Sequence, residues 1–132
     1  MMYYESTRGG KEGIASAEAI KRGISPDGGL YVPQQFEKIS IDEITEFVDR
    51  PYTQRAVSIL KRFLDDFSGE ELAGCVNRAY GGGKFSSEAI APVVRLNDTL
   101  DVLELWHGPT CAFKDMALQI LPHFMVKAMQ KT

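Results

Sequence analysis

The sequence has little cysteine, little histidine and no long apolar run, and each scarcity excludes a class of protein. It contains 2 cysteines, Cys75 and Cys111, and 2 histidines, which form no recognisable zinc pattern or disulfide framework. We therefore expect free thiols and no metal. No apolar run approaches the roughly 20 residues that cross a bilayer, and residues 1–11 lack the pattern of a signal peptide. These absences predict no membrane partner and a cytoplasmic location.

Neither sign of charge dominates the chain. Lysine and arginine number 15, and aspartate and glutamate number 18, for a net charge of -3. A strongly basic face is not indicated, so we expect no nucleic-acid partner. The hydrophobic content of 44% and charged content of 25% are ordinary for a globular protein. The length of 132 residues favours one domain, or a small domain and part of another.

Turn and cap signals divide residues 1–80 into short strands and about four helices. Strands are predicted at 2–5 and 30–32, on either side of a helix at 16–22 and a Pro-Asp-Gly-Gly turn. Ser16 is the expected N-cap of that helix and Gly23 its stop. Two capping boxes then mark further helix starts; they pair Ser40 with Glu43 and Ser68 with Glu71.

Apolar residues recur at helical spacing after these signals. Pro51 is expected to end one helix and to begin the next. The three apolar stripes should pack against each other or against a short sheet. They comprise Ile41, Ile44, Phe47 and Val48; Ala56, Val57, Leu60, Phe63 and Leu64; and Leu72, Cys75, Val76, Ala79 and Tyr80.

A glycine run at 81–83 separates this region from the rest of the chain. Followed by Lys84, it invites comparison with a phosphate-binding loop. That pattern fails, because its first glycine would fall on Arg78 and because Phe85, not Ser or Thr, follows the lysine. A helix stop and a flexible linker at 81–85 is the preferred interpretation.

Residues 86–132 predict two strands, a loop and an apolar helix. The strands are expected at 93–96 and 100–106, around a turn at Asn97-Asp98. The helix is expected at 116–129, with a kink at Pro122 that costs about 3 kcal/mol. The helix has little polar surface, so we expect the sequence to be cut within a domain and two copies to associate through this segment.

Lys114 is the residue whose surroundings suggest chemistry. It follows a strand and a Gly-Pro turn, lies between Phe113 and Asp115, and precedes the apolar helix. Partial desolvation there would lower the pKa of the lysine, and a neutral amine can condense with an aldehyde. Judged from spacing alone, an exposed structural lysine in a first helical turn is the commoner case.

Two segments of the chain carry specific motifs. The first, around the lysine, comprises His107-Gly108-Pro109-Thr110 and Ala112-Phe113-Lys114-Asp115. The second, at the start of the chain, comprises Ser6-Thr7-Arg8-Gly9 and Asp27-Gly28-Gly29-Leu30-Tyr31-Val32-Pro33. Both segments resemble the threonine synthase family, occur in that family's order and at compatible spacing, and together extend over most of the chain.

The resemblance implies an α+β fold: a small N-terminal domain at 1–80 and, from 86, the truncated start of a pyridoxal-phosphate (PLP)-binding α/β domain of the tryptophan-synthase-β class. It implies a lyase that converts O-phospho-L-homoserine and water into L-threonine and phosphate. Lys114 would hold PLP covalently and move protons as base and acid. The family's phosphate-binding glycine loop lies downstream of Thr132, so the chain alone should be inactive and should bind PLP weakly or not at all.

The remaining site candidates have alternatives that the residues leave open. Phe113 packs beside the cofactor or in the core, and Thr110 contacts substrate or serves as a turn hydroxyl. Arg8 binds the substrate phosphate or loop carbonyls. Asp115 is an N-cap or a hydrogen-bond partner near the lysine. His107 is a structural histidine by default, and Cys111 is a small apolar filler where relatives often carry leucine.

A different class of function also fits the chain. A non-catalytic binding or interaction domain derived from the same fold would account for the helices and the apolar stripes. Such a domain would have no need of a lysine within its complete flanking motif. The sequence therefore favours the enzyme, with Lys114 as the residue that distinguishes the two hypotheses.

Overall fold

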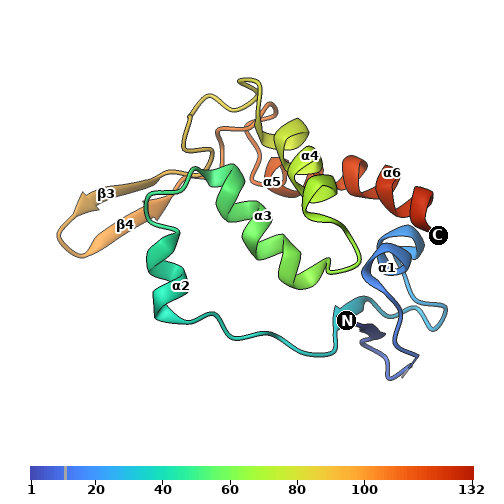
Figure 1. The fold of residues 1–132 in the computed structure, drawn as a ribbon. Coiled ribbons are helices and arrows are strands. Elements are labelled where there is room, and N and C mark those ends of the chain that lie inside the picture. Colours follow the sequence, from blue (N-terminus) through green and yellow to red (C-terminus); the bar gives the residue numbers. More distant parts are fainter. Residues whose placement is uncertain (11) are drawn as a thin grey trace.

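The computed structural model describes residues 1–10 and 12–132 and has the α+β architecture that the sequence predicts (Figure 1). Four helices lie in the first 80 residues, as expected. The elements are β1 (Tyr4–Ser6), α1 (Ser16–Arg22), β2 (Tyr31–Pro33), α2 (Ile41–Glu46), α3 (Tyr52–Phe63), α4 (Gly69–Tyr80), β3 (Val93–Asn97), β4 (Leu100–Leu103), α5 (Asp115–Leu118) and α6 (Leu121–Lys131).

The strands form two separate antiparallel pairs. In the first, β1 pairs with β2, with Glu5 opposite Val32. The Tyr4 hydroxyl donates to the Phe63 carbonyl oxygen at 2.8 Å and so ties β1 to the end of α3. In the second, β3 and β4 form a hairpin that projects from the helices (Figure 1). All four strands were predicted, although the pairing of β1 with β2 was not, and β4 ends at Leu103 and not at Trp106.

One hydrophobic core joins residues from both ends of the chain. It is centred on α4, which packs against α3 and α6, while α1 packs against α6. The division into domains at 1–80 and 86–132 stays a prediction. The buried core comprises Ala17, Leu64, Phe67, Leu72, Cys75, Val76, Ala79, Tyr80, Phe85, Ile90, Ile120, Phe124 and Ala128.

The starts of α2 and α4 follow the predicted caps, whereas the start of α1 does not. Both capping boxes are present, and Gly23 ends α1 with φ of 71°. Ser16 was predicted to be the N-cap of α1, but Ala15 holds that position. The physical reason is a remote carboxylate: Asp66 accepts hydrogen bonds from the Ser16 hydroxyl and, at 2.9 Å, from the Ala17 N–H. Asp66 thus satisfies a backbone N–H in the first turn of α1, as a local N-cap side chain would.

The prediction that all three helical stripes are buried is wrong for α2. This helix has no buried residue; Ile41 is 75% exposed and Val48, in the turn that follows, is 69% exposed. Pro51 ends this region and is the N-cap of α3, not its first helical residue. Its φ of -62° already suits a helix start.

The predicted helix at 116–129 is two helices. Pro122 lies in the first turn of α6, where its missing N–H costs nothing, so the chain bends before it. Phe124 and Ala128 are buried against the core. Self-association through this segment stays a prediction.

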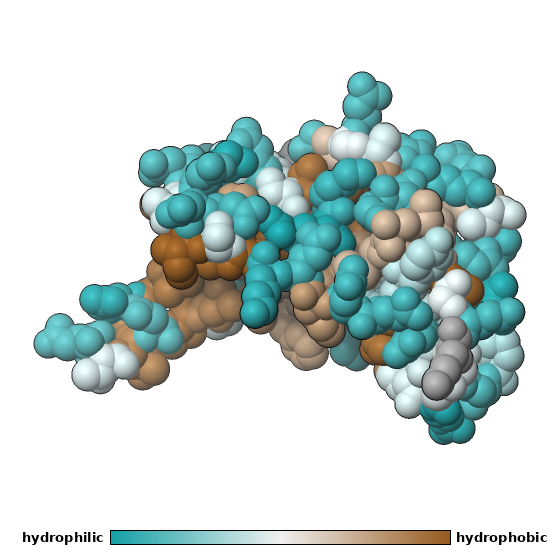
Figure 2. Space-filling view, turned by 60° about the horizontal axis from the view of Figure 1, so that its bottom comes forward, coloured by the Kyte–Doolittle hydropathy of each residue, from teal (hydrophilic) through white to brown (hydrophobic). Residues whose placement is uncertain are grey.

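The hairpin leaves much of its apolar surface exposed. Figure 2 shows apolar residues gathered along the projecting arm and at its base. Val93 and Leu96 are 65% and 62% exposed, and Leu103 is 54% exposed. This surface continues into the cavity described below, because Val93 and Leu103 also line that cavity.

Candidate functional site

The loop between β4 and α5 carries the lysine motif and contains two tight turns. The Cys111 N–H donates to the Gly108 carbonyl oxygen, and the Asp115 N–H donates to that of Ala112, both at 3.0 Å. Cys111 adopts a φ of 58°, in the left-handed region, and is exposed. The expectation that Cys111 fills an apolar space is therefore wrong, because this turn leaves its side chain in solvent.

Asp115 is the buried polar centre of this loop, with 1% of its surface exposed. Its Oδ2 accepts hydrogen bonds from the Thr110 N–H at 2.8 Å and from the Thr110 hydroxyl at 2.9 Å. The N-cap prediction for Asp115 is wrong: Lys114 holds the N-cap position, without a side-chain cap, and Asp115 is the first residue of α5. The alternative, a hydrogen bond near the lysine, is what the structure has.

Hydrogen bonds keep the Asp115 carboxyl ionised. Burial by itself would raise the pKa of Asp115, because it disfavours the charged form. Donors on Thr110 and the Gln119 amide, 3.4 Å from Oδ1, outweigh burial and hold the pKa below its usual value. The carboxylate is thus an acceptor that several donors share.

Gly108 is required by the close approach of the loop to Asp115. A Cβ on Gly108 would lie 2.4 Å from the Asp115 Cβ and 2.5 Å from its Oδ2. Such contacts are too short for any side chain, so an alanine there would push the loop and the carboxylate apart. The Gly-Pro step of the motif therefore serves packing as well as turning.

His107 links the loop to two other segments. Its Nε2 lies 2.6 Å from Glu104 Oε2, and its Nδ1 lies 2.9 Å from the Ser86 Oγ. The Ser86 N–H also donates to the His107 carbonyl oxygen at 2.9 Å. Both ring nitrogens of His107 are thus hydrogen-bonded, as expected of a structural histidine, and its role stays a prediction.

Lys114 lies at the edge of an apolar cavity of about 760 Å³, which we call the α5 cavity. The side chain of Lys114 is exposed, so the expected partial desolvation is not provided by the described residues. Within residues 1–10 and 12–132, its amine has no hydrogen bond or ion pair. The cavity is lined by Tyr52, Arg55, Ala56, Ile59, Leu60, Tyr80, Ala91, Val93, Leu103, Leu105, Phe113, Lys114, Met116 and Ala117.

The other predicted site residues fall in two places. Phe113 lines the same cavity and is 66% exposed, so it does not pack in the core. Arg8 follows β1, which lies well apart from α5 in Figure 1, and its Nη1 donates to the Asp27 carbonyl oxygen at 3.3 Å. The structure thus brings Thr110, Phe113 and Lys114 into one loop and leaves Arg8 in another part of the chain.

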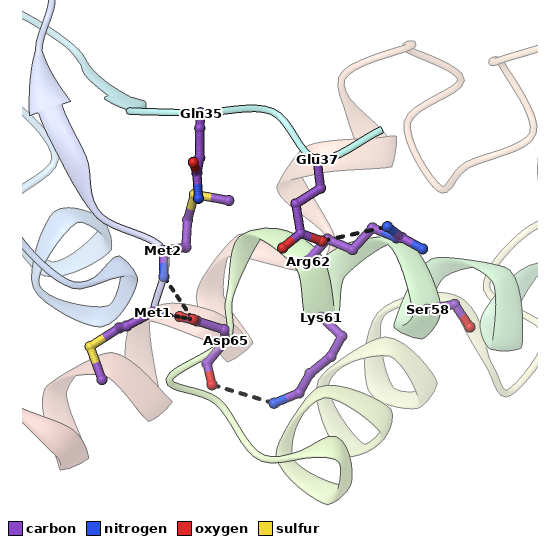
Figure 3. Close-up of a pocket in the computed structure, with 8 residues that line it drawn as sticks. All are labelled: Met1, Met2, Gln35, Glu37, Ser58, Lys61, Arg62 and Asp65. Atoms are coloured by element: carbon purple, nitrogen blue, oxygen red, sulfur yellow. Dashed lines mark hydrogen bonds and ion pairs between the residues drawn. The ribbon is translucent and has the colours of Figure 1, made fainter. Parts of the chain in front are cut away.

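A second pocket, which we call the polar pocket, lies at the C-terminal end of α3 (Figure 3). Its charged side chains already have hydrogen-bond partners within the chain, although the buried Oδ1 of Asp65 has none among the described residues. The Met2 N–H donates to Asp65 at 2.7 Å, Lys61 donates to the Phe67 carbonyl oxygen at 2.7 Å, and Arg62 bonds Glu43 and Glu37. The contrast with the unpaired amine of Lys114 favours the α5 cavity as the functional site.

Two kinds of feature are absent from the part of the chain that the structure describes. No group of three or more His, Cys, Asp or Glu side chains is arranged to hold a metal ion. No helix among these residues has the length and apolar character needed to cross a membrane.

Sequence reasoning missed two contributors to the loop. It overlooked Ser86, whose contact with His107 joins segments 21 positions apart and leaves no local signal. It also overlooked the reason for Gly108. The spacing of Thr110 and Asp115 in the sequence was a possible signal for this turn. A hydroxyl five positions before a carboxylate can donate a hydrogen bond to it and so close the loop between them.

Comparison with known proteins agrees with this geometry. The model of the family described as "Threonine synthase N terminus" matches residues 3–80. A threonine synthase from Methylobacillus glycogenes is 37% identical over 127 residues, which cover 91% of this chain and 27% of that protein. One from Pseudomonas aeruginosa is 35% identical over 131 residues, which cover 98% and 28%.

The fold is shared with solved structures. A PLP-bound threonine synthase from Brucella melitensis superposes with a TM-score of 0.91 at 33% identity, covering 99% of this chain and 28% of that one. Yeast threonine synthase gives 0.88 at 29% identity, covering 98% and 26%. The chain thus spans little more than a quarter of these relatives. On the family match and this likeness, the chain belongs to the threonine synthase family.

Proposed function

We propose that the complete protein is a PLP-dependent lyase that converts O-phospho-L-homoserine and water into L-threonine and phosphate, with Lys114 as the residue that holds the cofactor. The observation that carries the proposal is an exposed amine, without a partner among the described residues, at the edge of an apolar cavity and within the family's complete motif. The PLP-bound relative from Brucella melitensis supports the choice of cofactor.

The residues around Lys114 fit such a group. PLP is a flat aromatic aldehyde, so its covalent attachment needs a primary amine and its ring needs apolar or aromatic neighbours. Lys114 offers the amine, and Phe113, exposed beside it, offers an aromatic face. We assign cofactor contact to these two residues. When bound, PLP supplies a pyridine ring that accepts electrons from the reacting carbons.

Lys114 would also move protons. In the complete protein, a neutral Lys114 amine would remove protons at Cα and Cβ of the substrate. Phosphate would leave from Cγ, water would add its hydroxyl at Cβ, and protons would return at Cγ and Cα. The flexible side chain would let one amine reach these neighbouring carbons. Contacts of Thr110 and Arg8 with substrate stay predictions, since the Thr110 hydroxyl donates to Asp115 and Arg8 donates to a loop carbonyl.

Borohydride reduction of the complete, PLP-loaded protein tests the proposal. We expect the cofactor's mass to remain on the peptide that contains Lys114 and to vanish in Lys114→Ala. Lys84→Ala is the matched control, because Lys84 is another exposed lysine, whose amine donates to the Arg78 carbonyl oxygen. Label on a different lysine would refute the assignment, and no label at all would favour a non-catalytic binding domain.

We further propose that the 132-residue chain is inactive by itself and self-associates. It spans little more than a quarter of its relatives, so most of their length has no counterpart in it. Exposed Leu118, Leu121, Val126 and Met129 on α5 and α6 support association through 116–129. Light scattering that shows only monomer at high concentration would contradict the proposed self-association. A cytoplasmic location also stays a prediction.

A further inference from the structure

Lys114 depends on its backbone for its position. Its amine has no hydrogen-bonding partner among the described residues, and its side chain is exposed, so no side-chain contact fixes where the amine lies. A lysine has four rotatable side-chain bonds, and the region that its amine samples is set by where its Cα is held. The contacts that hold the backbone at 114 therefore control the reach of the amine.

The backbone at Lys114 is held in place by the hydrogen bonds of the next residue, Asp115. Asp115, 1% exposed, accepts two hydrogen bonds from Thr110 at one oxygen and a weaker one from Gln119 at the other. These bonds close the loop from 110 to 115 into a ring. Gly108 lets the loop pack directly on the carboxylate, where a Cβ would lie 2.5 Å from Oδ2 and 2.8 Å from Cγ of Asp115.

The opposite end of the loop is held as well. His107 is bonded to Glu104 and Ser86, so the segment from 107 to 115 is anchored at both ends, while the Lys114 amine has no hydrogen bond to any residue in 1–10 and 12–132. A rigid loop that presents an unpartnered side chain is the arrangement expected where a reactive group must be placed accurately. Burying a carboxylate to stabilise a simple surface turn would be costly by comparison.

We propose that Asp115, through its hydrogen bonds from Thr110, is the positioning residue of Lys114: it fixes the loop so that the lysine amine meets the carbonyl carbon of its aldehyde cofactor. This inference rests on the proposed function, because it assumes that Lys114 is the attachment point. Asp115 itself is not a catalytic residue, since its carboxylate is used within the loop.

The chain offers a matched control for the hydrogen-bonded pair of Thr110 and Asp115. Asp66 accepts a hydroxyl hydrogen bond from buried Ser16 and a backbone N–H bond from Ala17, so its chemistry parallels that of Asp115 with Thr110. The Ser16–Asp66 pair holds α1 and does not line the α5 cavity. Removing its hydroxyl should therefore cost stability without changing the placement of Lys114.

The experiment uses the complete protein and two measurements: the rate at which PLP becomes attached to Lys114, and the thermal midpoint of the apoprotein. Thr110→Val removes the hydroxyl and keeps the N–H and the branched shape. We expect it to slow attachment by about tenfold or more, because misplacement of about 1 Å can cost on the order of 100-fold. Thr110→Ser, which restores the hydroxyl, should recover most of the rate.

The control is Ser16→Ala, which should lower the thermal midpoint and leave the attachment rate unchanged. The inference is overturned if Thr110→Val attaches PLP at the wild-type rate, or if Ser16→Ala slows attachment as much. Hydrogen exchange of residues 107–115 adds a measurement without cofactor: unchanged exchange in Thr110→Val would overturn the inference as well. Wild-type protein that takes no PLP on Lys114 would instead refute the proposed function.

Discussion

Helices α2 and α4 begin with the same capping box and finish in opposite environments. In each, a serine side chain accepts a hydrogen bond from the backbone N–H of a glutamate three residues later. The carboxylate of that glutamate in turn accepts a hydrogen bond from the serine N–H. Each is followed by an apolar stripe. Yet α4 buries Leu72 completely, while Ile41, at the start of α2, is 75% exposed.

The comparison separates what starts a helix from what stabilises a fold. Capping satisfies backbone groups that the first turn leaves free, and that requirement is local. Burial requires a partner surface, which α3 and α6 offer to α4. Since α4 also contacts α5, where the Tyr80 hydroxyl donates to the Met116 carbonyl oxygen at 2.5 Å, the buried helix and not the exposed one supports the lysine loop.

The largest expected effect contrasts the two stripes. Leu72→Ala should lower the free energy of unfolding by about 3 kcal/mol, because it removes buried methyl groups and leaves a cavity. Ile41→Ala should change it by less than about 0.5 kcal/mol. Urea unfolding measures both. Equal losses would show that the stripe of α2 is buried in solution and would break the comparison.

The next effect tests the two caps. Ser68→Ala and Ser40→Ala should each cost the helix about 1 kcal/mol, since the hydrogen bonds that they remove are alike. Only Ser68→Ala should lower global stability, because α4 unfolds with the core. Ser40→Ala should instead speed hydrogen exchange within α2. An equal fall in global stability would mean that α2 belongs to the core's cooperative unit.

A smaller effect concerns pH. The pKa of Glu71 is lowered, first by its hydrogen bond with Lys131 and then by the Ser68 N–H. Its folded pKa lies below its unfolded value, so its contribution is complete above pH 4.5 and is lost as pH falls through the lowered pKa. Glu71→Gln should therefore lower the thermal midpoint at pH 7.

Once the pH falls below the lowered pKa of Glu71, the difference between Glu71→Gln and the wild type should largely vanish, because both side chains are then neutral. Glu43→Gln is the matched control. The pKa of Glu43 is also lowered, first by the Ser40 N–H and then by Arg62, but its helix is exposed. A loss in Glu71→Gln that persists undiminished at low pH would indicate packing, not charge, as its cause.

The smallest effect is expected at the surface of α2. Glu46 and Arg50 form an ion pair at 3.0 Å, with their side chains 66% and 40% exposed. Glu46→Gln should change the free energy of unfolding by less than about 0.5 kcal/mol, because solvent screens the pair. Urea unfolding at low and high salt measures it. A larger, salt-sensitive loss would show that α2 is held more firmly than its burial indicates.

Most of the fold could be predicted because its signals are local. Caps, glycine stops and the hairpin turn, which lies at Asp98-Thr99 and so one residue later than predicted, each act within a few residues, and the helices and the hairpin follow them. The errors arose where a distant group intervened. Asp66, and not the Ser16 side chain, accepts the hydrogen bonds at the start of α1. The apolar side chains of α2 pack against no other surface in the described part of the chain that would bury them.

The site was predictable in part for the same reason. The motif placed Thr110, Phe113 and Lys114 in one loop, and the structure agrees. The burial of Asp115 was not foreseen, because it depends on Gly108 and Thr110 folding back upon it. Nor was the exposure of Lys114 foreseen, since exposure depends on which segments lie over a residue.

By itself the sequence determined where α2 and α4 begin and which family the lysine motif resembles, because capping and motif chemistry depend on residues a few positions apart. Only the tertiary structure decided which apolar stripe is buried, which carboxylate caps α1 and which residue holds the lysine loop. Those outcomes depend on contacts between segments far apart in the chain, such as Ser16 with Asp66 and Ser86 with His107.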